Sequence, residues 1–355
     1  MGWWGCDTLA GLREVARAAS VSLGTASAVY TGSRGVSSAA RRRVLAAAAA
    51  LRYEARPRAR SSAGSLVLMS HYGSLDSLLA HPNDGDIAQS ILEGAGRARI
   101  PVSYVQITAA NAGELLVRER SRTRRAFILL NVAPNWSRDA LRRRRSGQIP
   151  VIVGDRGLAH RYDTVVSDDI SSMRSMADRM AAAGERRFVI LQGPQEYTAF
   201  RDRFTAATDT LSRAGGPHHL IRCVRCADGF PAGRVAAASV LATAGGRHAT
   251  VLAAHDLQAL GLLSGLQQMG VSVPEDLSLI GWDDIVPARN STPELTTVRV
   301  PRRLLGRLAE QLAEERLAGT GSGPPQTVTV SCDFIERQTT RSAAPDGRKA
   351  VRRPL

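Results

Sequence analysis

Three hydroxyl side chains at the start of a short predicted helix are the first residues able to do chemistry. Ser22, Thr25 and Ser27 lie within six residues of one another, in a region rich in arginine. Hydroxyl groups at this place can cap a helix by accepting hydrogen bonds from its free N–H groups. They can also donate to the oxygens of an anion such as a phosphate. The pattern therefore indicates an anionic partner, with simple capping and turn filling as the alternative.

The charge of the chain is concentrated in the same region. Residues 1–65 hold ten arginines against Asp7, Glu14 and Glu54, a net charge of +7, while the whole chain of 355 residues carries +15. Arginine on phosphate releases counterions, so a basic segment of this kind is typical of proteins that bind nucleic acids. Lys349 is the only lysine, and the excess of arginine over lysine is equally consistent with a GC-rich genome.

Three short helices must position the hydroxyl groups. Leu12, Val15, Ala16 and Ala19 recur at the spacing that places apolar groups on one helix face. A break at residues 20–22 precedes a second helix, from residue 23 to about residue 30, and Gly32 suits the left-handed residue that ends it. Helix, turn and helix form the unit whose second helix enters the major groove of DNA. The alternative is a three-helix bundle that does not bind nucleic acids.

The segment from residue 14 to residue 53 resembles the N-terminal signature of the lactose-repressor (LacI/GalR) family. It reads EVARAASVSLGTASAVYTGSRGVSSAARRRVLAAAAALRY, with Glu14 in place of the usual aspartate. The matching residues are Val15, Ala16, Ala19, Val21, Ser22, Thr25, Ser27, Val29, Gly32, Val36, Ser37, Arg41, Arg43, Val44 and Tyr53. The resemblance implies a regulator that binds double-stranded DNA.

The DNA contacts that the resemblance implies are unusually poor in base-reading groups. Leu23 and Gly24 stand where side chains meet base edges and cannot make paired hydrogen bonds, and Ala28 stands where the family carries arginine. The operator is then read through thymine methyl groups, DNA shape and the hinge, or specificity is modest. The expected DNA-binding residues are Ser22, Leu23, Gly24, Thr25, Ser27, Ala28, Arg41, Arg56, Arg58 and Arg60.

The linker at residues 52–65 departs from the family. Its equivalent forms a hinge helix on the operator, and a leucine wedges into the minor groove. Here only Ala59 and Arg60 match, Ser62 occupies the leucine position, and Pro57 falls where a helix should propagate. We expect a weaker kink or none, and a flexible basic linker is the alternative.

From residue 66 onward short apolar runs alternate with helical patterns, as in parallel sheets covered by helices. Expected strands are 66–70, 101–107, 125–131, 150–155, 163–168, 187–193, 219–225, 249–255 and 277–284. Expected helices are 87–99, 112–121, 137–146, 172–183, 199–214, 232–243, 257–268 and 302–317.

This alternation of strands and helices resembles the periplasmic-binding-protein-like core of the same family. Residues 254–284 and 292–301 match its motifs closely, and residues 194–204 match more loosely. The implied fold is an all-α helix-turn-helix head followed by an α/β core of two doubly wound parallel-sheet subdomains. The expected domains are the head (1–51), the hinge (52–65), the core for effector binding and dimerisation (66–340) and a basic tail (341–355).

A small effector, a sugar or a derivative, is expected at the carboxyl ends of the strands. By resemblance, Arg203 is the cleft arginine and Asp283 the acid after the turn, while His255 replaces the usual asparagine. Since imidazole can gain charge near neutral pH, the effector is either unlike a simple neutral sugar or carries an acidic group. Weaker candidates at strand ends are Asp168, Ser171 and Phe230.

Two of these assignments have structural alternatives. Arg203 could equally lie on a solvated helix face, and Asp256, next to His255, could serve to cap the following helix.

Other chemistries have weak support. A zinc site at His218, His219, Cys223 and Cys226 conflicts with a strand, where positions three apart face opposite sides. Phosphate-binding glycine loops and the G-x-S-x-G nucleophile motif are absent from the sequence, so no cofactor and no metal are expected, and an enzyme is only a remote alternative.

The resulting hypothesis is a homodimeric regulator, most often a repressor in such proteins, on a palindromic operator. Apolar runs of 18 residues and a signal-peptide pattern are lacking, so we expect a cytoplasmic, nucleoid-associated protein without a membrane partner. The main alternative is a DNA-binding relative that has lost its response to an effector.

Overall fold

The computed structural model describes residues 12–22, 25, 26, 29, 37, 39, 40, 43, 44, 46, 47, 64–118, 124–145, 147–215, 219–321 and 323–341. The chain divides into two compact units, residues 1–60 and residues 61–355. In the part that is described, no helix is long and apolar enough to cross a membrane.

The first unit has a small apolar core of its own. Helix α1 (Leu12–Ala18) buries Val15 and Ala16, and Ala19 follows them on the same side. These side chains pack with Ala26, Val29 and Val44, which come later in the segment. The predicted apolar face of this helix is confirmed by the burial of Val15, Ala16 and Ala19.

The turn after α1 is closed by Ser20 and Ser22. Ser20 has a φ of 51°, a left-handed conformation that ends the helix. The hydroxyl of Ser22 accepts from the backbone N–H of Thr25 at 3.0 Å, which is the geometry of a helix N-cap.

Replacing Ser22 with alanine is expected to lower the stability of the first unit by about 1 kcal/mol, because the N–H of Thr25 loses its acceptor. Native-state hydrogen exchange of the α1 amides in the full chain measures this change. Ser22→Gly is the matched control and should lose only a few tenths of a kcal/mol. Equal exchange in S22A and the natural chain would rule out a stabilising cap.

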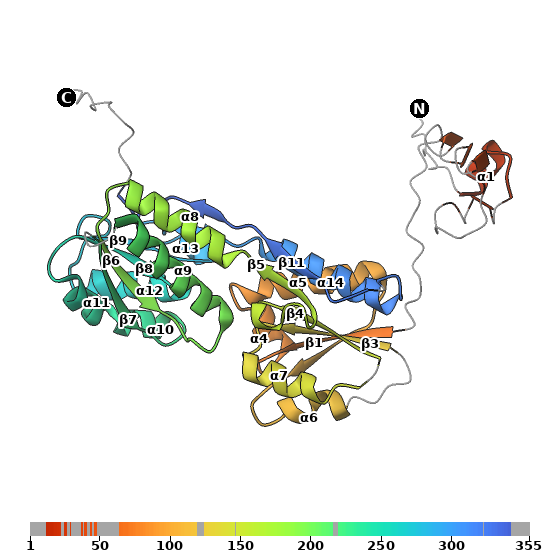
Figure 1. Cartoon of the computed structure of the whole chain (residues 1–355), viewed down its shortest axis with the longest axis horizontal. Helices are drawn as coiled ribbons and strands as arrows, with labels where there is room; N and C mark the ends of the chain where they lie inside the picture. Colours follow the sequence, from red (N-terminus) through yellow and green to blue (C-terminus); the bar gives the residue numbers. More distant parts are fainter. Residues whose placement is uncertain are drawn as a thin grey trace, which may run out of the picture. The chain divides into compact units, whose positions relative to one another are not determined.

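The second unit begins with a parallel sheet in the order β11-β5-β4-β3-β1-β2. Its strands are β1 (Gly64–Ser70), β2 (Val102–Gln106), β3 (Arg124–Leu130), β4 (Gln148–Val153), β5 (Asp163–Ser167) and β11 (Thr327–Val330). Helices α5 (Asp84–Ala98) and α14 (Arg302–Leu317) cover one face, and α6 (Ala112–Arg118) and α7 (Pro134–Arg142) cover the other (Figure 1). A short helix, α4 (Leu75–Leu79), precedes α5, and a 3-10 turn, η1 (Arg156–Leu158), follows β4.

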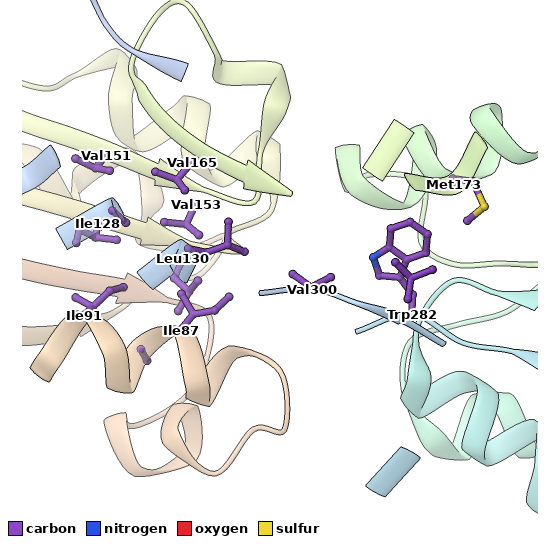
Figure 2. Packing of buried hydrophobic residues seen from close by; sticks show 14 of the residues in the cluster. Ile87, Ile91, Ile128, Leu130, Val151, Val153, Val165, Met173, Trp282 and Val300 are labelled. Atoms are coloured by element: carbon purple, nitrogen blue, oxygen red, sulfur yellow. The ribbon is translucent and has the colours of Figure 1, made fainter. Parts of the chain in front are cut away.

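Alternating burial along β1 explains this two-sided packing. Leu66 and Leu68 belong to the cluster on the α5 side, whereas Val67 and Met69 belong to the cluster with α6 and α7. Because successive strand residues face opposite sides, a continuous apolar run fills both layers. Figure 2 shows Ile87 and Ile91 of α5 next to Ile128 and Leu130 of β3.

A second parallel sheet has the order β7-β6-β8-β9. Its strands are β6 (Arg187–Gln192), β7 (Leu220–Arg225), β8 (Ala249–Ala253) and β9 (Leu277–Ile280). Around it lie α8 (Asp169–Ala182), α9 (Thr198–Gly215), α10 (Phe230–Val235), α11 (Ala237–Ala244), α12 (Asp256–Gln268) and α13 (Val286–Arg289). The two doubly wound subdomains that the sequence predicts are therefore confirmed.

The structure corrects the prediction at three places. The helix predicted at 232–243 is divided at Ala236 into α10 and α11. The strand predicted at 277–284 ends at Ile280, and residues 281–285 turn toward α13. Two further features were not predicted: the antiparallel pair of β10 (Thr297–Arg299) with β12 (Asp333–Ile335), and the return of β11 to the first sheet. These strands are three or four residues long and form only through distant partners, so periodicity does not reveal them.

A buried carboxyl group lies between the helices that cover the first sheet. Glu310 of α14 is 6% exposed and faces Gly94 of α5, where a Cβ atom would meet the carboxyl oxygen. Burial raises the pKa of Glu310 to about 7, Glu314 adds to this, and Arg97 opposes it. Folding therefore takes up a proton, and stability decreases as pH rises from the ordinary range of a glutamate to about 7.

Glu310→Gln is expected to make the chain more stable than the natural protein at around pH 8 and equally stable at around pH 5. The amide keeps the shape of the side chain and removes the buried charge. Urea unfolding at the two pH values measures the difference. If the two proteins keep the same stability difference at both pH values, Glu310 does not titrate in this range.

Candidate functional site

The carboxyl ends of strands from both sheets line one cavity of about 230 Å³. Because parallel strands of a doubly wound sheet end at the same edge, the loops that follow them converge there. From the first subdomain the lining residues are His71, Tyr72, His81, Pro82, Asn83, Asp84, Asn131, Val132, Pro134, Gly154 and Asp155. From the second they are Tyr197, Thr198, Ala199, Phe200, Arg203, Asp228, His255, Leu257, Asp283 and Ile285.

Arg203 of α9 forms part of the cavity wall and is 7% exposed. One terminal nitrogen donates to the carbonyl of Ala254 at 2.8 Å, and the other lies 3.4 Å from Oδ1 of Asp169. The guanidinium lies over the ring of Trp282, with 4.6 Å to the ring centroid. Arg203 is thus a buried, oriented cation rather than a residue of a solvated helix face.

Asp283 lies in the turn after β9, with a φ of 114°. Its backbone N–H donates to the carbonyl of Val298 in β10, and its own carbonyl accepts from Arg302. Burial raises the pKa of its carboxyl group to about 6, although the nearby Arg203 and His255 act in the opposite direction. The turn therefore directs an acid of shifted pKa into the cavity, which is typical of a functional site.

His255 and Asp228 face each other at the ends of β8 and β7. The imidazole Nε2 of His255 lies 2.7 Å from Oδ1 of Asp228, and the imidazole ring stacks on Phe200 with 5.6 Å between centroids. Contact with the imidazole of His255 lowers the pKa of Asp228, against the effect of burial. A charge on His255 is therefore matched inside the cavity.

Asp84 is the centre of the polar wall contributed by the first subdomain. It is 3% exposed, and its carboxylate accepts from Tyr72 at 3.0 Å, Asn83 at 3.0 Å and Asn131 at 2.6 Å. These bonds join residues that follow β1 and β3 to the start of α5. The carboxylate of Asp84 thus orients three donors of the protein, which already occupy its acceptor sites.

Hydrogen bonds join the two subdomains beside the cavity. Thr198 donates to Oδ1 of Asp155 at 3.0 Å. Arg302 donates to Asp86 of α5 at 2.9 Å while also holding the carbonyls of the turn at residues 283 and 284. A structural change in the cavity can therefore be transmitted to both subdomains through these short hydrogen bonds.

The structure brings together three of the predicted effector residues, Arg203, His255 and Asp283. The other three lie outside the lining. Asp168 is the N-cap of α8 and accepts from the N–H of Ser171 at 3.2 Å, so both residues serve the helix start. Phe230 begins α10 and is 40% exposed.

Asp256 has a structural role, but it is not the side-chain cap of α12. Its carboxyl group accepts from the N–H of Ile285 at 2.9 Å and from the hydroxyl of Thr297 at 2.6 Å. Burial, and then the proximity of Asp283, raise its pKa well above the usual range. Asp256 thus holds the turn that carries Asp283 against β10.

Sequence reasoning missed three acids of the cavity, Asp84, Asp155 and Asp228. A signal was present for two of them. Asp155 ends the expected strand at 150–155, and Asp228 follows the expected strand at 219–225 by three residues. Asp84 begins a helix, and only the fold brings it to the strand ends.

Of the predicted DNA contacts, the structure describes Ser22 and Thr25, which meet in the N-cap of the second helical segment. Leu23, Gly24, Ser27, Ala28, Arg41, Arg56, Arg58 and Arg60 lie outside the described residues, as do positions 52–63 of the linker.

The cysteine and histidine cluster near β7 does not form a metal site in the described part of the chain. Cys223 is on β7 and exposed, Cys226 follows the strand, and Nδ1 of His219 lies 2.8 Å from the carbonyl of Leu211. His218 lies outside the described residues.

Comparison with known proteins gives matches to both parts of the chain. Residues 11–55 match the model of bacterial regulatory proteins of the lacI family, and residues 177–340 match the periplasmic binding protein-like domain. An uncharacterised HTH-type transcriptional regulator of Streptomyces limosus is 29% identical over 326 residues, which are 87% of this chain and 90% of that protein. The HTH-type transcriptional repressor PurR of Escherichia coli is 27% identical, over 93% of this chain and 97% of the repressor.

Solved structures show the same architecture. The complex of the transcriptional regulator CelR with cellobiose superposes with a TM-score of 0.68 at 25% identity, over 93% of this chain and 99% of that one. A lac repressor dimer bound to operator and an anti-inducer is similar in fold, with a TM-score of 0.63 at 20% identity, over 93% of this chain and 99% of the repressor chain. Because both family matches fall on one chain that aligns with these regulators over nearly its whole length, the chain belongs to the LacI family of bacterial transcriptional regulators.

Proposed function

We propose that this regulator represses transcription as a homodimer on a palindromic operator, and that a small sugar-like effector in the cavity sets its affinity for DNA. The observation that carries the proposal is the cavity itself, lined from both subdomains and containing Arg203, His255 and Asp283. The relative PurR is named a repressor, CelR was solved with cellobiose, and the lac repressor was solved as a dimer on its operator. In this proposal residues 1–51 bind DNA, 52–65 connect, and 66–340 bind the effector and dimerise, in the cytoplasm at the nucleoid.

The cavity supports a simple coupling mechanism. An effector that bridges the two subdomains favours the relative angle at which it contacts both, and that angle sets the spacing of the two heads of the dimer. The contacts of Thr198 with Asp155 and of Arg302 with the carbonyls of residues 283 and 284 lie where such a change would be transmitted. A ligand shifts this equilibrium only as far as its affinities for the two angles differ.

Sequencing of genomic fragments that bind to the purified full chain tests the DNA-binding function. We expect enrichment of fragments with a shared palindrome, bound more tightly than random DNA, with an affinity that falls steeply as salt rises. Arg41→Ala should weaken binding to all sequences and reduce the salt slope by about one. Arg143→Ala is the matched control, because Arg143 is exposed at the end of α7, in the second unit. Equal affinity for enriched and random duplexes would contradict the proposal.

A further inference from the structure

Acids dominate the charged side chains that line the cavity. Asp84, Asp155, Asp228 and Asp283 line it together with Arg203, which is the only arginine or lysine among the lining residues. Three histidines complete the titratable set, His71, His81 and His255. An anionic ligand would enter a field of predominantly negative sign, which raises the free energy of binding.

Arg203 does not provide a free charge for an anion. Its two terminal nitrogens already contact the carbonyl of Ala254 and the carboxylate of Asp169, which is 4% exposed. Burial lowers the pKa of His81, with Asp84 opposing, which favours the neutral imidazole. His255 is already matched by Asp228. The terminal nitrogens of Arg203 and Nε2 of His255 are thus engaged inside the protein, whereas Nε of Arg203 and Nδ1 of His71 are buried without a partner among the described residues.

Asp155 offers unused acceptor capacity. This residue is 4% exposed, and Oδ1 accepts from the N–H of Gly157 at 2.9 Å and from the hydroxyl of Thr198 at 3.0 Å. Its second oxygen, Oδ2, is buried and has no hydrogen-bond partner in the described chain, and neither has Oδ1 of Asn83. Buried acceptors without partners cost free energy, so a ligand that donates hydrogen bonds to them gains most.

Aromatic side chains line the same cavity. Tyr197 meets Phe200 edge to face at 5.8 Å between centroids, and Phe200 stacks on His255. On the other subdomain Tyr72 lies against His81, with 5.1 Å between ring centroids. Aromatic faces combined with carboxylates favour ligands that carry a positive charge, because the ring quadrupole attracts cations.

From these observations we infer that the effector is a small hydroxylated molecule with a protonated amine, an amino sugar, whose ammonium group binds at Asp155. The inference rests on the proposed function, since it assumes that this cavity is the effector site. Of the two alternatives drawn from His255, it keeps an effector unlike a simple neutral sugar and sets aside an acidic one, because His255 is paired with Asp228. The volume of about 230 Å³ is consistent with a ligand smaller than the drug-sized molecules that fill pockets of roughly 300–1,000 Å³.

Thermal shift and calorimetry of the full-length protein with three matched sugar series test the inference. Each series keeps one ring and changes its charge: glucose, glucosamine and glucuronate, then the galactose and the mannose counterparts. In at least one series we expect the amine to bind about tenfold more tightly than the neutral sugar, and the uronate to give no shift. Equal or tighter binding of a neutral sugar or a uronate would overturn the amine assignment and leave the effector function intact. Absence of binding by every sugar would overturn both.

Asp155→Asn provides the site-specific test. The amide can keep the two bonds to Gly157 and Thr198 and replaces only the unpartnered oxygen. We expect affinity for the amino sugar to fall about tenfold, with a much smaller change for its neutral counterpart. Asp209→Asn, an exposed acid on α9, is the matched control and should leave both affinities unchanged. An unchanged preference for the amine in D155N would show that Asp155 does not bind the ammonium group, whatever the melting temperature of the variant.

Discussion

Replacing Asp284 with asparagine is expected to lower the free energy of unfolding by about 3–5 kcal/mol, the range found when one partner of a buried ion pair is removed. The carboxylate of Asp284 is fully buried and lies 2.8 Å from Arg289, 2.7 Å from Arg299 and 2.5 Å from Arg337. Arg289 and Arg299 are about half exposed, so most of the loss comes from Arg337, which is 10% exposed.

The pH dependence of this loss has a definite sign. Burial alone would raise the pKa of Asp284, but hydrogen bonds from Arg299, Arg337 and Arg289 lower it below the usual value. Stability from a carboxylate with a lowered pKa is present above the pKa of the unfolded chain, about 3.9, and is lost as the pH falls through the folded value. The difference between the natural chain and D284N should therefore shrink in acid below about pH 4.

Two comparisons separate charge from backbone effects at this position. Asp284 has a φ of 54°, and asparagine tolerates this region nearly as well as aspartate. Asp284→Ala should lose roughly 1–2 kcal/mol more than D284N, because alanine lacks that tolerance. Urea unfolding at neutral and acidic pH measures both variants. A D284N protein as stable as the natural chain at neutral pH would contradict the role of the three arginines.

Arg203→Met is expected to cost a similar amount, about 3–5 kcal/mol, and to weaken any ligand of the cavity. The substitution leaves Asp169 without its guanidinium and the carbonyl of Ala254 without its donor. It also removes the cation that opposes the rise in the pKa of Asp283, which is about 6 in the natural chain. The loss should thus be larger above pH 6, where Asp283 is ionised, than below it.

The matched control for this variant is Arg201→Met on the same helix. Arg201 is exposed and donates to the carbonyl of Gln195 at 3.2 Å, so its loss should change stability by less than about 0.5 kcal/mol. Arg203→Lys should recover only part of the loss, since an ammonium group lacks the planar fork that contacts Ala254 and Asp169 together. Equal stability of R203M and R201M would show that the buried ion pair contributes nothing.

The parts of the fold that the sequence predicts are those with a local pattern of apolar residues. Apolar runs such as residues 66–70 predict buried parallel strands, and the spacing of Val15, Ala16 and Ala19 predicts the buried side of the first helix. Arg203, His255 and Asp283 fall in or near matching motifs, and the structure brings all three into one cavity. The family motif did not indicate that His255 is paired with Asp228, since that contact joins the ends of two different strands.

The remaining features depend on contacts that sequence spacing does not encode. Asp168 and Ser171 follow a strand, as binding residues do, but the carboxylate of Asp168 caps α8 by accepting from the backbone N–H of Ser171. Asp84 becomes part of the cavity only because Tyr72 and Asn131 reach it from the ends of β1 and β3. The short strands β10 and β12 pair across more than thirty residues, so neither shows a pattern of its own.

Reciprocal linkage is the most direct test of an effector-controlled DNA-binding protein. The affinity of the full chain for its most enriched genomic duplex is measured with and without the sugar that gives the largest thermal shift, and the affinity for that sugar is measured with and without the duplex. We predict a change of roughly 5-fold to 150-fold, equal in both directions. A factor of one in either direction, with the protein saturated by the first ligand, would contradict the account.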